Sequence, residues 1–250
     1  MPSGLIIVTG GSRGIGAAIC RRLAGDGYAV AVNYAADAKA AEATVAEIKK
    51  SGGRAQAFQA DVADPAALRN LFEQATQALG PLAGLVNNAG SSGRVARTDE
   101  QDAAELTRLF ALNVTGTILA CKEAVLRLST RHGGIGGSIV NLSSVAARTG
   151  GLPGLVTYSA TKGAIETLTK GLATEVGPEG IRVNAVAPGV IESDMTQPLL
   201  AQASARERIE TLTPLRRLGV PEEVAEAAAW LISPAARFVT GSVVTVSGGR

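Results

Sequence analysis

The feature that most constrains this chain is the regular alternation of short β-branched runs with longer stretches of helical period. Seven runs are strand candidates, at residues 5–9, 28–34, 54–60, 84–88, 138–144, 181–187 and 242–247. Several of them are apolar on both sides, which is typical of parallel strands that helices cover on both faces. The alternation therefore predicts an α/β fold with a doubly wound parallel sheet of about seven strands.

The stretches between these runs carry apolar residues at three- and four-residue spacing, as amphipathic helices do. Start and stop signals agree, since Asp64-Pro65 is typical of a helix start and Gly52-Gly53 of a helix end. No linker or internal repeat divides the chain, so we expect one domain over residues 1–250. The expected helices cover residues 15–25, 38–51, 65–79, 100–131, 158–176 and 221–233.

Composition and charge exclude several classes of function. With 46% hydrophobic residues and a net charge of +2, the 250-residue chain has enough apolar residues for a large core but no broad basic field for nucleic acid or an anionic membrane. The two cysteines, Cys20 and Cys121, lie far apart among helix-forming residues, so we expect no metal site and no disulfide framework. The apolar run at the N-terminus is too short for a signal peptide or a membrane span. We therefore expect a cytoplasmic protein whose partners are small molecules.

A glycine-rich loop, Thr9 to Gly16, follows the first predicted strand and opens the first predicted helix. Glycine lets the backbone turn tightly and approach a pyrophosphate, while the helix start directs unpaired N–H groups and a partial positive charge at it. The loop therefore predicts an anion-binding site. The alternative is a glycine-rich turn without a ligand, and the loop alone does not identify an enzyme.

Five motifs, in order along the chain, resemble those of the classical short-chain dehydrogenases. They are TGxxxGIG at 9–16, NNAG at 87–90, Asn113 in a long helix, a serine followed by YxxxK at 158–162, and PG at 188–189. The resemblance covers essentially the whole chain. It implies a single Rossmann-like NAD(P)-binding domain and an oxidoreductase that moves a hydride between nicotinamide and a carbonyl or alcohol carbon.

The resemblance also implies which positions contact the cofactor. The glycine loop would hold the pyrophosphate, the pair after the third strand the adenine, the NNAG loop a ribose, and the segment after the sixth strand the nicotinamide carboxamide. A helix cap at Asp61 and a rigid turn at Pro188-Gly189 are the structural alternatives. The implied contacts are Gly10, Ser12, Arg13, Gly14, Ile15, Gly16, Asn33, Asp61, Val62, Asn88, Ala89, Gly90, Tyr158, Lys162, Pro188, Gly189, Ile191 and Ser193.

Charge near the second predicted strand favours NADP(H) over NAD(H). An acid at the end of that strand would bind a ribose 2′-OH and repel a 2′-phosphate, but the strand ends Val32-Asn33-Tyr34. Arg13 resembles the basic residue that NADP-preferring relatives place in the glycine loop. Asp37 lies a few residues on, however, which leaves NAD(H) as the alternative.

Tyr158 and Lys162 lie four residues apart, so both project from one face of a helix. An ammonium near the phenol would lower its pKa from about 10, and Tyr158 would then act as the acid or base. Such a pair alone is usually an ordinary helix face, and the resemblance makes it catalytic. It also assigns Ser144, rather than Ser143, to hold the substrate oxygen, across a loop longer than in many relatives, and Asn113 to hold water connected to the lysine.

Substrate selection should depend on residues 192–217, which follow the nicotinamide-contacting stretch and are expected to form a mobile lid with an apolar wall at Met195, Leu199 and Leu200. Three functions remain open. The first is an NADP(H)-dependent oxidoreductase of ketones, sugars or secondary alcohols. The second is a 3-oxoacyl-[acyl-carrier-protein] reductase, whose acidic carrier would need a basic entrance such as Arg94, Arg97 and Arg148. The third is a noncatalytic NADP-binding regulator, against which the intact catalytic set argues.

The resemblance further implies a homotetramer, or a dimer, joined through the long helices and the C-terminal strand. Trp230, by contrast, is expected to pack inside the subunit.

Overall fold

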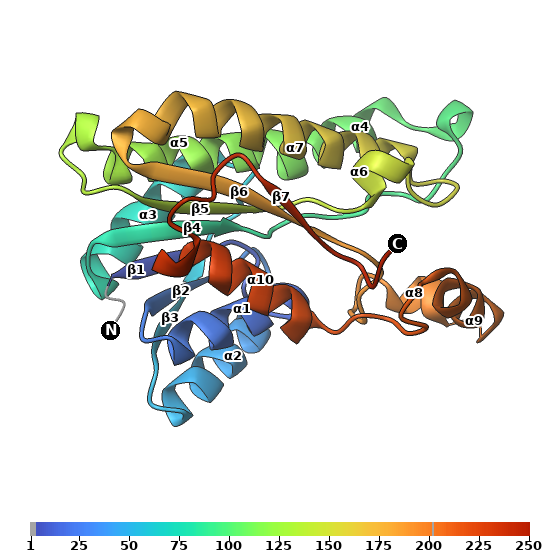
Figure 1. The fold of residues 1–250 in the computed structure, drawn as a ribbon, viewed down its shortest axis with the longest axis horizontal. Coiled ribbons are helices and arrows are strands. Elements are labelled where there is room, and N and C mark those ends of the chain that lie inside the picture. The colour runs from blue at the N-terminus through green and yellow to red at the C-terminus, as the bar shows by residue number, and fades with distance from the viewer. Residues whose placement is uncertain (1–3, 202) are drawn as a thin grey trace.

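A computed structural model describes residues 4–201 and 203–250, and these form one seven-stranded parallel sheet (Figure 1). The strand order is β3-β2-β1-β4-β5-β6-β7, so the direction of winding reverses between β1 and β4. The predicted fold class and each of the seven predicted strands are confirmed. The strands are β1 Leu5–Val8, β2 Ala29–Tyr34, β3 Arg54–Gln59, β4 Leu82–Asn87, β5 Gly137–Leu142, β6 Ile181–Pro188 and β7 Val243–Val246.

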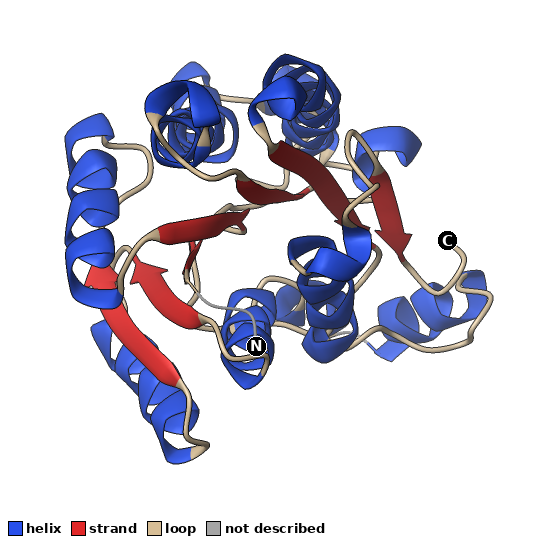
Figure 2. Cartoon of the chain, turned by 60° about the vertical axis from the view of Figure 1, so that its left-hand side comes forward, coloured by secondary structure: helices blue, strands red, loops and turns tan. Residues whose placement is uncertain are grey.

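Helices cover both faces of this sheet (Figure 2). One face carries α1 Gly14–Gly25, α2 Ala38–Lys50 and α10 Pro221–Ile232, and the other carries α3 Pro65–Leu79, α5 Gly116–Leu128 and α7 Val156–Val176. The shorter helices are α4 Ala103–Phe110, α6 Ala146–Thr149, α8 Gln197–Leu200 and α9 Ala203–Leu212.

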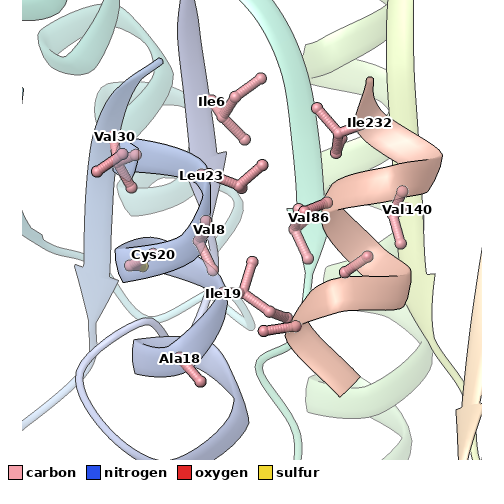
Figure 3. Close-up of a cluster of buried hydrophobic side chains, with 14 of the residues drawn as sticks. Ile6, Val8, Ala18, Ile19, Cys20, Leu23, Val30, Val86, Val140 and Ile232 are labelled. Atoms are coloured by element: carbon pink, nitrogen blue, oxygen red, sulfur yellow. The ribbon is translucent and has the colours of Figure 1, made fainter. Parts of the chain in front are cut away.

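Alternate side chains of the central strands fill two separate cores. Ile6 and Val8 point towards α1 and α10 (Figure 3), whereas Leu5 and Ile7 point towards the opposite helix layer. All four are fully buried. This explains why the strands are apolar on both sides, because a parallel sheet between two helix layers exposes neither face to water.

The predicted helix over residues 100–131 is interrupted. Asp102 caps α4 by accepting hydrogen bonds from the backbone N–H groups of Ala104 and Glu105, so the helix begins three residues later than expected. A π-helical turn, Ala111–Thr115, then separates α4 from α5 and carries Asn113. Such turns occur mainly at functional sites, where they redirect a side chain that a regular helix would place elsewhere.

The stretch Ala103–Leu128 is the one helical stretch of the described residues that is long and apolar enough to span a membrane by length and composition. It lies against the sheet and buries the polar side chains of Asn113 and Glu123. Core helices of other proteins pass the same test, so the stretch carries no membrane assignment.

Trp230 does not pack inside the subunit, contrary to the sequence prediction. It is 42% exposed on α10, and Phe238, a few residues before β7, is 100% exposed. Helical periodicity identifies which positions share a face, but it does not show that the face carrying Trp230 has no neighbour within the subunit.

The winding of the sheet brings the ends of four strands to one edge. Parallel strands all point the same way, so the loops after β1, β4, β5 and β6 meet beyond the carboxyl edge. Backbone hydrogen bonds from Ser143 to Val186, 2.7 Å, and from Val145 to Pro188, 3.0 Å, continue the pairing of β5 with β6 past the sheet. Every predicted motif except Asn113 and the YxxxK pair lies on these loops.

Candidate active site

The glycine loop after β1 is tied to the loop after β4 by four hydrogen bonds. Thr9 Oγ1 accepts from the backbone N–H groups of Asn88 and Ala89, both at 3.0 Å. The Asn88 side chain donates to the carbonyls of Thr9, 3.1 Å, and Gly10, 2.9 Å. A Cβ atom at Gly16 would lie 2.1 Å from the Gly10 oxygen and 2.5 Å from Asn88 Nδ2, so only glycine fits there. The loop is thus held open at the N-terminus of α1, where a pyrophosphate would meet helix N–H groups.

Asn33 lies beneath this loop and not on its surface. Its side chain is 1% exposed, its Oδ1 accepts from the backbone N–H of Gly10 at 3.2 Å, and its Nδ2 donates to the carbonyl of Ala60 at 3.0 Å. Because both ends of the amide bind backbone, Asn33 supports the loop from the end of β2. The direct cofactor contact that the sequence predicts for Asn33 stays a prediction.

Asp61 and Val62, the pair predicted to contact the adenine, also make contacts within the protein. Asp61 Oδ1 accepts from the backbone N–H of Ala63 at 2.9 Å, while the neighbouring Asp64 caps α3. Val62 is buried in the core beneath the sheet. The alternative of a helix cap at Asp61 is wrong, because Asp64 is the N-cap of α3 and Asp61 closes only the preceding turn.

The segment after β6 rests on the glycine loop. Ile191 is buried, and a Cβ atom at Gly14 would lie 3.8 Å from that of Ser193. Arg13 forms an exposed ion pair with Asp194, 3.3 Å between Nη1 and Oδ2. Residues from the first and sixth strand ends, remote in sequence, thus lie together at the crevice where α/β proteins bind ligands, and this crevice is called the groove below.

Lys162, Asn113 and Gly90 converge beside this groove. Lys162 Nζ donates to the carbonyl of Leu142 at 2.7 Å and lies 5.7 Å from the centre of the Tyr158 ring. A Cβ atom at Gly90 would lie 3.8 Å from Lys162 Nζ and 3.2 Å from Asn113 Oδ1. Three elements therefore meet here, with Asn113 from the π-helical turn, Gly90 from the loop after β4 and Lys162 from α7.

The electrostatics of the tyrosine differ from the sequence prediction. Burial raises the pKa of Tyr158 above its ordinary value, and a hydrogen bond with Ser144 opposes the rise. Burial also lowers the pKa of Lys162 to about 8. The net shift of the Tyr158 pKa is thus opposite in direction to the one expected from the lysine, because burial disfavours the phenolate. Tyr158 therefore stays protonated at neutral pH, as a proton donor must.

Ser144, and not Ser143, is the serine that contacts Tyr158. Ser144 Oγ also accepts from the backbone N–H of Ala146 at 3.2 Å. Ser143 is buried behind it, where its hydroxyl donates to the Lys162 carbonyl and to Glu166 Oε1, both at 3.3 Å. The strand end thus directs one serine towards the groove and the other into the interior.

Sequence reasoning missed the residues that hold Asn113 in place. Asn113 Nδ2 donates to the Ser91 carbonyl at 2.8 Å and to Thr161 Oγ1 at 3.1 Å, and its Oδ1 accepts from the Ser91 N–H at 3.0 Å. The polar residue inside the YxxxK motif, Thr161, was the available signal. Because this amide is fully engaged with the protein, it ties the loop after β4 to α7.

Neither cysteine belongs to this site. Cys20 and Cys121 are both buried as free thiols, and burial raises the pKa of each, that of Cys121 to about 12. Within residues 4–201 and 203–250, no three histidine, cysteine, aspartate or glutamate side chains lie close enough together to hold a metal ion.

Comparison with known proteins agrees with this arrangement. The family model described as enoyl-(acyl carrier protein) reductase, which covers short-chain dehydrogenases, matches residues 10–250. The chain belongs to the short-chain dehydrogenase/reductase family. It is therefore an oxidoreductase that acts on alcohol or carbonyl groups of small molecules with a nicotinamide cofactor.

Relatives in this family carry varied names. The chain is 44% identical to the uncharacterized oxidoreductase YgfF of Escherichia coli K12 over 98% of this chain and 99% of that protein. Identity is 38% to glucose 1-dehydrogenase 2 of Bacillus subtilis, covering 97% and 93% of the two chains. It is 40% to the 3-oxoacyl-[acyl-carrier-protein] reductase FabG of Staphylococcus aureus, covering 97% and 96%.

Solved structures show the same fold with either cofactor. A short-chain dehydrogenase from Burkholderia cenocepacia in complex with NADP superposes with a TM-score of 0.89 at 38% identity, covering 98% of this chain and 96% of that one. A 7α-hydroxysteroid dehydrogenase complexed with NADH gives 0.91 at 33% identity, covering 98% and 93%. Cofactor preference thus varies on one scaffold.

The glycine loop yields a direct test with a control in the same helix. We expect Gly16→Ala to weaken cofactor binding about tenfold or more, because the new Cβ atom pushes Gly10 and Asn88 apart. Gly25→Ala, at the other end of α1, meets no atom within 4 Å and should keep wild-type affinity with equal or higher thermal stability. Titration of both variants with NADPH and NADH measures this, and unchanged affinity in Gly16→Ala would contradict the assignment of the loop.

Proposed function

We propose that this short-chain dehydrogenase is an NADP(H)-dependent oxidoreductase that interconverts a small ketone, sugar or similar carbonyl compound with its secondary alcohol. The observation that carries the proposal is the partly buried Tyr158 in contact with Ser144 and beside Lys162, next to the ends of β4 and β5. NADP(H), when bound, supplies or accepts the hydride. The chain itself must then bind the carbonyl oxygen and move one proton.

Each catalytic side chain has one task in this proposal. Ser144 holds the substrate oxygen, and Tyr158 donates its proton to that oxygen as negative charge develops there. Lys162, held by the Leu142 carbonyl, places positive charge near the phenolate that remains. Asn113 keeps the loop after β4 against α7 and so closes the side of the site.

The preference for NADP(H) rests on the charges around the adenosine end of the groove. Arg13 lies on the surface of the glycine loop, and Asn33 at the end of β2 is neutral and turned inward. Asp37 accepts from the backbone N–H of Ala40 as the cap of α2. The Burkholderia relative in complex with NADP supports this preference, while the NADH complex of the hydroxysteroid dehydrogenase keeps NAD(H) as the alternative.

Arg13→Ala separates the two cofactors. Loss of a charge-assisted contact to the 2′-phosphate should weaken NADPH binding about tenfold or more and leave NADH binding within about twofold. Arg97→Ala removes another exposed arginine, which pairs with Asp99, and serves as the control. Equal weakening of both cofactors by Arg13→Ala would count against the assignment.

A small substrate fits the surface better than an acidic carrier protein does. Among the described residues, most arginines near the entrance and lid already pair with carboxylates, which leaves little free positive charge for a carrier. The 3-oxoacyl-[acyl-carrier-protein] reductase reading stays as the second candidate because FabG is a relative. A noncatalytic regulator is disfavoured because it would need no proton donor. The pairs are Arg97–Asp99, Arg148–Glu166, Arg206–Glu192 and Arg217–Glu223.

Residues 192–217 are proposed as the substrate lid. Ile191 pairs with Gly219 in an isolated bridge, so both ends of the segment leave the body of the protein at one neck. Its helices α8 and α9 lie to one side of the sheet (Figure 1). Met195 is 50% exposed, so its side chain is accessible to a substrate, as the predicted apolar wall requires. The side chain of Leu199 lies outside the described residues.

The deciding experiment follows nicotinamide absorbance across ketones, diketones, aldoses and acyl thioesters, with wild type and Tyr158→Phe. We expect turnover with at least one carbonyl class and its loss by about a hundredfold or more in the variant, because general acid catalysis contributes that much. Cofactor affinity should stay within about twofold, because the ring remains. A wild-type protein that binds NADPH and turns over none of these compounds would favour the regulator.

Exposed apolar side chains support a homotetramer. They gather on two surfaces, the outer side of α4 and α5 and the region from α10 to β7, where large hydrophobic groups in water would destabilise a monomer. Free buried thiols agree with a cytoplasmic location. The side chains are Phe110, Ile118 and Leu126 on the first surface and Trp230 and Phe238 on the second.

Phe238→Glu tests the second surface. A charge at a fully exposed position costs the folded subunit little, but it would have to be desolvated in an interface. We expect light scattering to report tetramers for wild type and smaller species for Phe238→Glu. Ile135→Glu, at another highly exposed apolar position, is the control. A monomeric wild type would refute the proposed assembly.

A further inference from the structure

An ion pair between Arg148 and Glu166 lies directly behind the proposed catalytic serine. Arg148 belongs to α6, which follows Ser144, and Glu166 lies on α7 one turn beyond Lys162. Arg148 Nε and Glu166 Oε2 are 3.1 Å apart. The pair therefore joins the segment that carries Ser144 to the helix that carries Tyr158 and Lys162.

Glu166 is almost entirely removed from water, and both of its oxygens are used. Its side chain is 11% exposed, Oε2 accepts from Arg148, and Oε1 accepts from the Ser143 hydroxyl at 3.3 Å. The single proton of this hydroxyl is shared between Glu166 and the Lys162 carbonyl, which also accepts from it at 3.3 Å. A buried carboxylate needs such partners, because loss of one leaves a charge that the interior cannot solvate.

Arg148 is anchored on its other side as well. Its Nη1 donates to Thr245 Oγ1 of β7 at 3.2 Å. A planar guanidinium that binds two elements at once restricts their relative position more than a single ammonium would. The loop after β5 is thus held from α7 on one side and from β7 on the other.

We propose that Glu166, held by Arg148, is a positioning residue that sets the place of Ser144 against Tyr158. It contacts Ser143 and not the reacting atoms, so it acts through the backbone that Ser143 and Ser144 share. Small displacements at a site of this kind reduce the rate strongly while leaving binding of the remote parts of a ligand intact. The kinetic consequence rests on the function proposed above, whereas the positional consequence does not.

The test compares Glu166→Gln with Glu123→Gln. Glu123 is a matched control, because it is 10% exposed and pairs with Arg127 at 2.7 Å on α5, away from the groove. Both variants lose one buried carboxylate charge, so both should lower the melting temperature. Arg148→Lys is a milder second variant at a half-exposed position, which keeps the charge but loses the planar contact.

The first readout is the ring signal of Tyr158 in carbon-13 spectra of the cofactor-free protein, assigned by its absence in Tyr158→Phe. The hydrogen bond with Ser144 lowers the pKa of Tyr158, so displacement of Ser144 should raise it. We expect the Tyr158 titration in Glu166→Gln to move upward, in the direction seen with Ser144→Ala, and to stay at the wild-type position in Glu123→Gln. Lys162, the ionisable group beside the ring, is present in all of these variants.

The second readout is steady-state turnover on the substrate found above. We expect kcat to fall about tenfold in Glu166→Gln and several-fold in Arg148→Lys, with the KM for the cofactor unchanged and Glu123→Gln at the wild-type rate. A Tyr158 titration at the wild-type position in both Glu166→Gln and Arg148→Lys would overturn the proposal. If the wild type turns over nothing, the proposed function fails and the titration alone decides the positioning role.

Discussion

The hydrogen bonds between the ends of β1 and β4 are the contact on which the rest of the site depends. These strands are neighbours only because the chain reverses its winding after β3, and the crevice they leave is where α/β proteins bind ligands. Thr9 and Asn88 close that crevice at the bottom with bonds to backbone on both sides. The glycine loop is therefore held in place, so an anion bound there would meet N–H groups that need no rearrangement.

The second constraint is the burial of charge on α7. Lys162 and Glu166 are both buried and lie one turn apart on the same helix. Each isolated charge would destabilise the fold by several kcal/mol, and each is offset by a particular partner, the Leu142 carbonyl for the lysine and Arg148 for the glutamate. Buried charged side chains, which destabilise the fold unless they are paired, are typical of functional sites. The same burial keeps Tyr158 protonated but disfavours the positive charge on Lys162, which the Leu142 carbonyl helps to hold.

The candidate active site and the exposed apolar side chains lie on different parts of the surface. The carboxyl edge of the sheet holds the groove and the neck of the 192–217 segment, while the outer faces of α5 and α10 expose large apolar side chains. These regions do not overlap, so assembly through the helices would leave the groove open to small molecules. Relatives named for glucose, steroids and carrier-bound acyl groups share this scaffold, so the scaffold alone does not fix the substrate.

The sequence by itself determined the seven strands, the helix layers and the family, because hydrophobic periodicity and short motifs are local properties. It also predicted the Tyr158, Lys162 and Ser144 set, and the fold brings these three residues together. Only the tertiary structure decided the inward turn of Asn33, the π-helical turn at Asn113, the raised pKa of Tyr158 and the exposure of Trp230. Each of these depends on what surrounds a side chain in three dimensions, since burial, hydrogen-bond partners and the absence of a neighbour leave no periodic trace in the chain.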